Sequence, residues 1–97
     1  IIFNKPTRAN MRITKTTQEK LQNILKAQNW NVRYEKGNFK GGYCIVHNQQ
    51  TIIINKFHPL ESKINTMIEI IRQLPVEAEK LSPDLQKLYQ RLLKHAE

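Results

Sequence analysis

The sequence predicts a small α+β domain in which a three-stranded, mainly antiparallel sheet packs on helices in the order α-β-β-β-α-α. Three observations predict this class. The 97-residue chain has the length of one domain. Apolar residues recur at helical spacing in three separate stretches, and β-rich runs bounded by turn-forming residues follow the first of them. We therefore expect one domain over residues 14–97, preceded over residues 1–13 by a basic arm or a short strand.

Three helices are predicted from capping residues and apolar stripes. Thr16 with Glu19 three positions later matches a capping box, and the helix that follows is expected to end near Asn29. Two more helices are expected at residues 59–74 and from residue 82 onward, because Pro is tolerated in a first helical turn and stops a helix elsewhere. The core-facing residues on these helices are expected to be Leu21, Ile24, Leu25, Leu60, Ile64, Met67, Ile68, Ile71, Leu74, Leu85, Leu88, Tyr89, Leu92 and Ala96.

The strands are predicted from alternating apolar and polar residues. Residues 30–35 alternate strictly, and the runs 43–47 and 51–56 form a hairpin around three turn-forming residues. If His47 pairs with Thr51, one face of the hairpin is expected to meet the helices, and Cys44 becomes a small core residue. The expected core face carries Cys44, Val46, Ile52 and Ile54, and the mixed opposite face carries Tyr43, Ile45 and Ile53.

Charge is the most informative property of the whole chain. Sixteen Lys and Arg residues face eight acidic ones, a formal net charge of +8. The entire excess lies in residues 1–60, because residues 61–97 carry equal numbers of basic and acidic residues. Such asymmetry favours an anionic partner, nucleic acid first and then an acidic protein or membrane surface, although charge that only serves solubility would give the same count.

The segment KGNFKGGYC, residues 36–44, contains all three glycines of the chain. A phosphate-binding P-loop would need Ser or Thr after Gly-Lys at the start of a helix, whereas these glycines lead into a strand. We interpret the segment as a strand connection that needs glycine at particular backbone angles. A second role stays open, in which Lys36 and Lys40 contact phosphates and Phe39 packs on a base or sugar.

The histidines, the cysteine and the acids are the candidates for catalysis and metal binding in this sequence. His47, His58 and His95 are not clustered at metal-ligand spacing, and the single Cys44 adds no second sulfur ligand. On a strand, Cys44 and His47 point to opposite faces, so they form no nucleophile–base pair. We therefore expect a non-catalytic protein without cofactor or metal. The longest apolar runs are far too short to span a membrane, and one unpaired cysteine is typical of the cytoplasm.

The middle of the chain resembles a known family. The helix, the glycine-led strand and TIIINKFHPLESKINTMIEII, over about residues 17–74, resemble the core of ImmA/IrrE-type metallopeptidases, in which a helix carrying HExxH follows a similar strand. The matching window is residues 68–72, where Glu69 aligns with the general base. Ile68 and Arg72 occupy the positions of the zinc-binding histidines, so the resemblance implies a degenerate, metal-free relative.

The order α-β-β-β-α also resembles the double-stranded-RNA-binding domain. That family opens its last helix with a basic motif. In this sequence Lys63 is the only basic residue near the corresponding position, so the motif that contacts RNA is missing.

Two functional hypotheses follow. The first is a non-catalytic module that binds RNA or DNA through its basic N-terminal half. The second is a protein-interaction or self-association module that uses the mixed sheet face of Tyr43, Ile45 and Ile53. The residues that we expect to contact nucleic acid in the first hypothesis are Lys5, Arg8, Arg12, Lys15, Lys36, Phe39 and Lys40.

Overall fold

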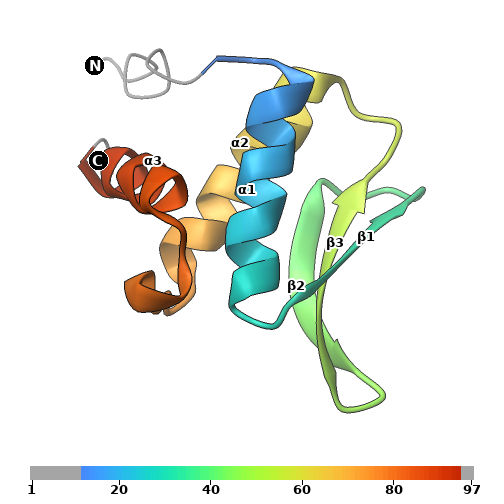
Figure 1. The fold of residues 1–97 in the computed structure, drawn as a ribbon. Coiled ribbons are helices and arrows are strands. Elements are labelled where there is room, and N and C mark those ends of the chain that lie inside the picture. Colours follow the sequence, from blue (N-terminus) through green and yellow to red (C-terminus); the bar gives the residue numbers. More distant parts are fainter. Residues whose placement is uncertain (1–11, 95–97) are drawn as a thin grey trace.

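The computed structural model describes residues 12–94. It shows a single α+β domain with the predicted order of elements (Figure 1). In chain order these are α1 (Lys15–Ala27), β1 (Asn31–Glu35), β2 (Gly41–Val46), β3 (Gln49–Asn55), α2 (Leu60–Gln73), a short 3-10 helix η2 (Ala78–Lys80) and α3 (Pro83–Lys94).

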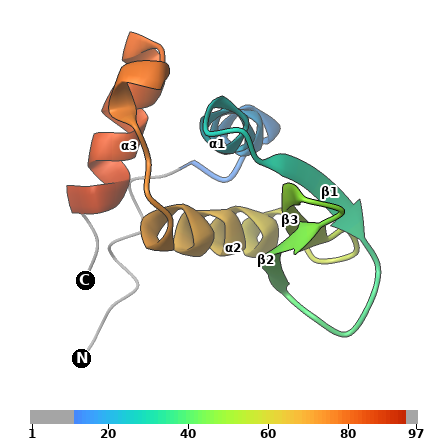
Figure 2. The same cartoon turned by 90° about the horizontal axis from the view of Figure 1, so that it is seen from below.

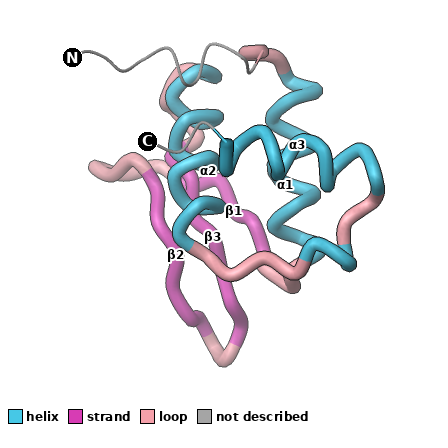
Figure 3. Tube along the Cα trace, turned by 90° about the vertical axis from the view of Figure 1, so that its left-hand side faces the viewer, coloured by secondary structure: helices cyan, strands magenta, loops and turns pink. Residues whose placement is uncertain are grey.

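The helices all lie on one side of the sheet. The helices α1 and α2 pack side by side against one sheet face, and α3 packs on them from the side away from the sheet (Figures 1 and 2). Figure 3 shows the same separation, with the strands forming one layer and the helices the other. The sheet therefore contributes one face to the core, and no helix of the described residues covers the opposite face.

The sheet is mixed rather than mainly antiparallel as predicted. Its strand order is β1-β3-β2. The central strand β3 runs parallel to β1 and antiparallel to β2. The connection over residues 36–40 must therefore cross the end of β3, because it joins the two edge strands instead of two neighbours. A short loop between alternating strands predicts direct pairing of those strands, which explains the error.

Helix α1 is capped at both ends by local hydrogen bonds. Its N-cap is Thr14, whose hydroxyl accepts a 3.1 Å bond from the Thr17 amide. The helix therefore begins before the predicted capping box. At the other end, Asn29 adopts a left-handed conformation (φ 69°) and the Trp30 amide donates to the Leu25 carbonyl at 3.1 Å. This Schellman motif reverses the chain into β1.

The core confirms the predicted helical stripes over the part of the chain that the structure describes. Burying these side chains is the main source of stability, at roughly 25 cal/mol per Å² of apolar surface. Leu60, Leu74, Leu85 and Tyr89 lie partly buried at the edge of the core, and Ala96 is outside the described residues. The fully or nearly buried apolar residues are Leu21, Ile24, Leu25, Ile52, Ile54, Ile64, Met67, Ile68, Ile70, Ile71, Leu81, Leu88 and Leu92.

The hairpin register differs from the prediction and changes which residues share a face. The turn has two residues, His47 and Asn48, both with positive φ (51° and 65°), and Val46 pairs with Gln49. Such a turn suits the right-handed twist of a hairpin. In this register Tyr43 lies opposite Ile52 and Ile45 opposite Gln50, whereas Cys44 lies opposite Thr51.

The new register corrects two predictions. Cys44 is exposed and is not a core residue. Tyr43, Ile45 and Ile53 do not share one face: Tyr43 and Ile45 lie on the helix-facing side with Ile52, and Ile53 lies on the other side. Tyr43 and Ile45 nevertheless remain 47% and 64% exposed. Both residues belong to β2, in the hairpin whose turn projects beyond the helices (Figure 1).

Candidate nucleic-acid interface

One edge of the sheet gathers several features that suit an anionic ligand. The parallel strands β1 and β3 both end at this edge, and α1 and α2 both begin there (upper part of Figure 1). The carboxyl ends of parallel strands are a common ligand-binding position in sheets covered by helices. No side chain caps the first turn of α2, so its free N–H groups contribute partial positive charge.

Asn55, at the end of β3, fixes the loop that crosses this edge. Its side chain is 3% exposed and donates 2.8 Å hydrogen bonds to the carbonyls of both Gly37 and Phe39. The side-chain Oδ1 accepts a 2.9 Å bond from the backbone amide of Phe57. The backbone amide of Asn55 donates to the Lys40 carbonyl. One buried amide therefore holds the 36–40 loop against the connection between β3 and α2.

Three lysines line a shallow cleft of about 410 Å³ at this edge. Lys15 comes from the start of α1, Lys56 from the residue after β3, and Lys63 from the first turn of α2. One acid, Glu19, also lines the cleft, so its lining carries a net positive charge. Three lysines from separate segments of the chain therefore share one cleft, an arrangement that can neutralise a phosphate.

Tyr34 forms the apolar wall of the cleft and is held in place by α1. Its hydroxyl donates a 2.7 Å bond to Gln22 Oε1 and accepts a 3.1 Å bond from Gln18 Nε2. Burial raises the pKa of Tyr34 above its ordinary value, and the bond from Gln18 opposes that rise in part. The Lys63 ammonium lies 5.7 Å from the centre of the Tyr34 ring, close enough for a cation–π contact.

Two aromatic side chains lie beside the lysines. Phe57 is 70% exposed, the largest exposure of any large apolar side chain in the described part of the chain, and the Lys56 ammonium lies 5.3 Å from its ring centre. Phe39 is 37% exposed, and its ring covers the backbone of Gly37. A Cβ at Gly37 would lie 2.3 Å from a ring carbon, so a side chain there would require the Phe39 ring to move. Both rings present area on which a base can stack.

The surface at this edge, here called the carboxyl-end surface, is defined by five lysines and two phenylalanines. The positive charge of Lys40 is partly neutralised, because its ammonium lies 3.9 Å from the Glu69 carboxylate. The other acids nearby are Glu61, exposed in the first turn of α2, and Glu35, which pairs with Arg33 at 2.8 Å. The residues of the carboxyl-end surface are Lys15, Lys36, Phe39, Lys40, Lys56, Phe57 and Lys63.

The sequence identified part of this surface. Lys15, Lys36, Phe39 and Lys40 belong to it, and Arg12 is exposed just before α1. Lys5 and Arg8 lie outside the described residues. Sequence reasoning missed Lys56, Phe57 and Lys63, since Lys63 falls in the electrically neutral second part of the chain. The available signal was the adjacent pair Lys56 and Phe57 at the end of a predicted strand.

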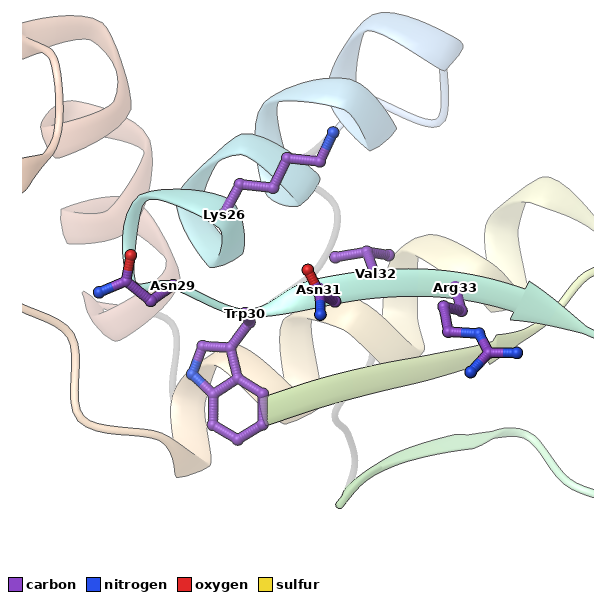
Figure 4. A pocket seen from close by; sticks show the side chains of 6 residues that line it. All are labelled: Lys26, Asn29, Trp30, Asn31, Val32 and Arg33. Atoms are coloured by element: carbon purple, nitrogen blue, oxygen red, sulfur yellow. The ribbon is translucent and has the colours of Figure 1, made fainter. Parts of the chain in front are cut away.

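A second depression lies along the start of β1, but its cationic groups do not converge. Its lining includes Lys26 from α1 and Trp30 and Arg33 from the segment that enters β1 (Figure 4). Figure 4 shows Lys26 pointing away from Trp30, and Arg33 further along the strand. Trp30 instead contacts Tyr43 edge to face, with ring centres 5.9 Å apart. This arrangement offers no single point at which an anion would contact both charges.

The window that resembles HExxH lies in α2. Ile68 is buried in the core, and Glu69 is exposed next to Lys40. Between residues 12 and 94, no group of three or more His, Cys, Asp and Glu side chains is placed to hold a metal ion. The kinship with the metallopeptidases stays a prediction.

The chain matches no protein-family model, and comparison with curated proteins and with solved structures finds no match. Within the described residues, no helix has the length and apolar character needed to cross a membrane.

Proposed function

We propose that this protein is a non-catalytic module that binds single-stranded nucleic acid, RNA or DNA, on the carboxyl-end surface. One observation carries the proposal: Lys15, Lys56 and Lys63 line a single cleft directly beside the exposed ring of Phe57. Proteins that bind single strands combine a cationic groove for the backbone with aromatic side chains for the bases. The one unpaired cysteine favours the cytoplasm as the compartment where this binding occurs.

The phosphates would be held in the lysine cleft. Tyr34 already uses its hydroxyl in bonds to α1, so the cleft offers a phosphate mainly the charges of its three lysines. The recognition of phosphate is therefore electrostatic and independent of sequence. The uncapped first turn of α2 adds N–H groups at the same edge.

The bases would stack on Phe57, and a neighbouring nucleotide would reach Phe39 across the loop that Asn55 fixes. Stacking of this kind contributes roughly 1–3 kcal/mol per base. In a duplex the faces of the bases are already stacked on one another, so the two rings favour a single strand over a duplex.

Fluorescence anisotropy with labelled single-stranded oligonucleotides, titrated at several salt concentrations, tests the proposal. Lys56→Ala and Lys63→Ala should each weaken binding and reduce the slope of log K against log salt by about 0.7 for each lost phosphate contact. Phe57→Ala should weaken binding by roughly 5- to 150-fold and leave the slope unchanged, because it removes stacking and no charge.

The matched control is Lys87→Ala. Lys87 is an exposed lysine on α3, and this helix lies on the side of α1 and α2 away from the sheet (Figure 2). Its replacement by Ala removes the same charge as the other two lysine substitutions. It should leave the affinity nearly unchanged, and circular dichroism should show every variant folded. Equal losses for Lys87→Ala and Lys63→Ala, or binding without a salt slope, would contradict the proposal.

A further inference from the structure

A second surface is distinguished by its lack of charge. Residues 41–55, which form β2, the turn and β3, contain no Lys, Arg, Asp or Glu, in a chain with a net charge of +8. Among residues 12–94, β2 pairs only with β3 and is therefore an edge strand of the sheet. Edge strands are usually protected by charged residues or Pro, and β2 has neither.

The free edge of β2 presents backbone groups in a defined pattern. The Asn55 amide donates to the Lys40 carbonyl, and backbone groups alternate in direction along a strand. Gly42, Cys44 and Val46 therefore direct their N–H and C=O groups toward β3, and Tyr43 and Ile45 direct theirs outward.

Helix α2 lies close to only the first part of this strand. A Cβ at Gly41 would lie 2.8 Å from Thr66 Cγ2 of α2, whereas Ile45, close to the hairpin turn in the sequence, is 64% exposed. The outward-facing groups around Cys44 and Ile45 are therefore accessible to another strand.

We propose that β2 pairs antiparallel with β2 of a second copy of this chain, about a two-fold axis at Cys44, so that two sheets become one continuous sheet. The lack of charge along β2 favours a second copy of this chain as the partner. Two copies that each carry +8 can approach here without like charges facing one another, and the edge offers no cation to attract a nucleic acid or an acidic peptide.

The pairing is self-complementary around Cys44. Tyr43 of one copy lies opposite Ile45 of the other, as a hydrogen-bonded pair whose backbone groups both point outward. The exposed rings and methyl groups of both residues then cover each other in both halves of the interface. Cys44 lies opposite Cys44 of the second copy as a non-hydrogen-bonded pair, with a Cα–Cα distance of about 4.5 Å. That distance is within the range of a disulfide.

Light scattering and disulfide trapping together test this interface. The wild-type chain should have the mass of a dimer at micromolar concentration, and mild oxidation with diamide should convert that dimer to a Cys44–Cys44 disulfide on a non-reducing gel. Cys44→Ser should abolish the cross-link and leave the dimer intact. Ile45→Lys, which places like charges beside the axis, should shift the chain to monomer.

Asn31→Lys is the matched control, because it adds the same charge on the other edge strand, β1. It should stay dimeric, and Tyr43→Lys should repeat the effect of Ile45→Lys, with circular dichroism identifying folded variants. A wild-type monomer, a dimer that does not cross-link through Cys44, or a dimer that survives both lysine substitutions would each overturn the proposal. A folded Ile45→Lys monomer should still bind the oligonucleotide, which keeps this test separate from that of the proposed function.

Discussion

At the scale of single residues, Asn55 has the greatest influence on the carboxyl-end surface. Its side chain satisfies two carbonyls of the 36–40 loop and one amide of the following connection, all from a buried position. No apolar residue can replace those bonds, and Asp would lack the two N–H donors. The loop that carries Phe39 is therefore ordered by one amide rather than by its own composition.

Replacing Asn55 with Ala should destabilise the fold by about 1–3 kcal/mol, because buried polar groups of the loop lose their partners. The change is measured as a lower midpoint of urea denaturation. Asn38→Ala is the control, since Asn38 is an exposed residue of the same loop. If the two variants have the same midpoint, the buried side chain does not hold the loop.

At the scale of elements, the approach of α2 to β2 depends on Gly41. A Cβ at this position would lie 2.7 Å from the Ile53 carbonyl oxygen and 2.8 Å from Thr66 Cγ2. The next glycine, Gly42, has nothing within 4 Å of its own hypothetical Cβ. The first glycine is therefore needed for helix–sheet packing, and the second is not.

This contrast gives a paired prediction for thermal or urea unfolding. Gly41→Ala should destabilise the protein by roughly 1–3 kcal/mol, because the strand or helix must shift to relieve the overlap. Gly42→Ala should leave stability unchanged or raise it by up to about 1 kcal/mol through the unfolded state. Equal effects at the two positions would show that α2 does not pack as closely as described.

The helices were predictable because each has a clear apolar stripe, and because Pro75 stops α2. The sheet was less predictable. Ile52, Ile53 and Ile54 are all apolar, so alternation does not reveal which of them face the core, and any of three turn-forming residues could occupy the turn. The parallel pairing of β1 with β3 is also invisible in the sequence, since β2 lies between these two strands in the chain and no turn joins them directly.

At the scale of the whole molecule, the fold redistributes charge that the sequence shows only as an asymmetry between two parts of the chain. It brings Lys63, from the neutral part, to the cleft with Lys15 and Lys56. Lys20 does not line this cleft and instead forms an ion pair with Asp84 of α3 at 3.3 Å. A count along the sequence therefore predicts that a basic surface exists, but only the three-dimensional arrangement says which lysines form it.

The central claim is that single-stranded nucleic acid binds at the carboxyl ends of β1 and β3. Backbone amide chemical shifts of the isotope-labelled protein, followed during titration with a short oligonucleotide, test it most directly. If nucleic acid binds there, we expect saturable chemical-shift changes at Lys15, Lys36–Lys40 and Lys56–Lys63, and no change along α3. Shifts centred on α3 or on the hairpin turn, or none at millimolar oligonucleotide, would contradict it.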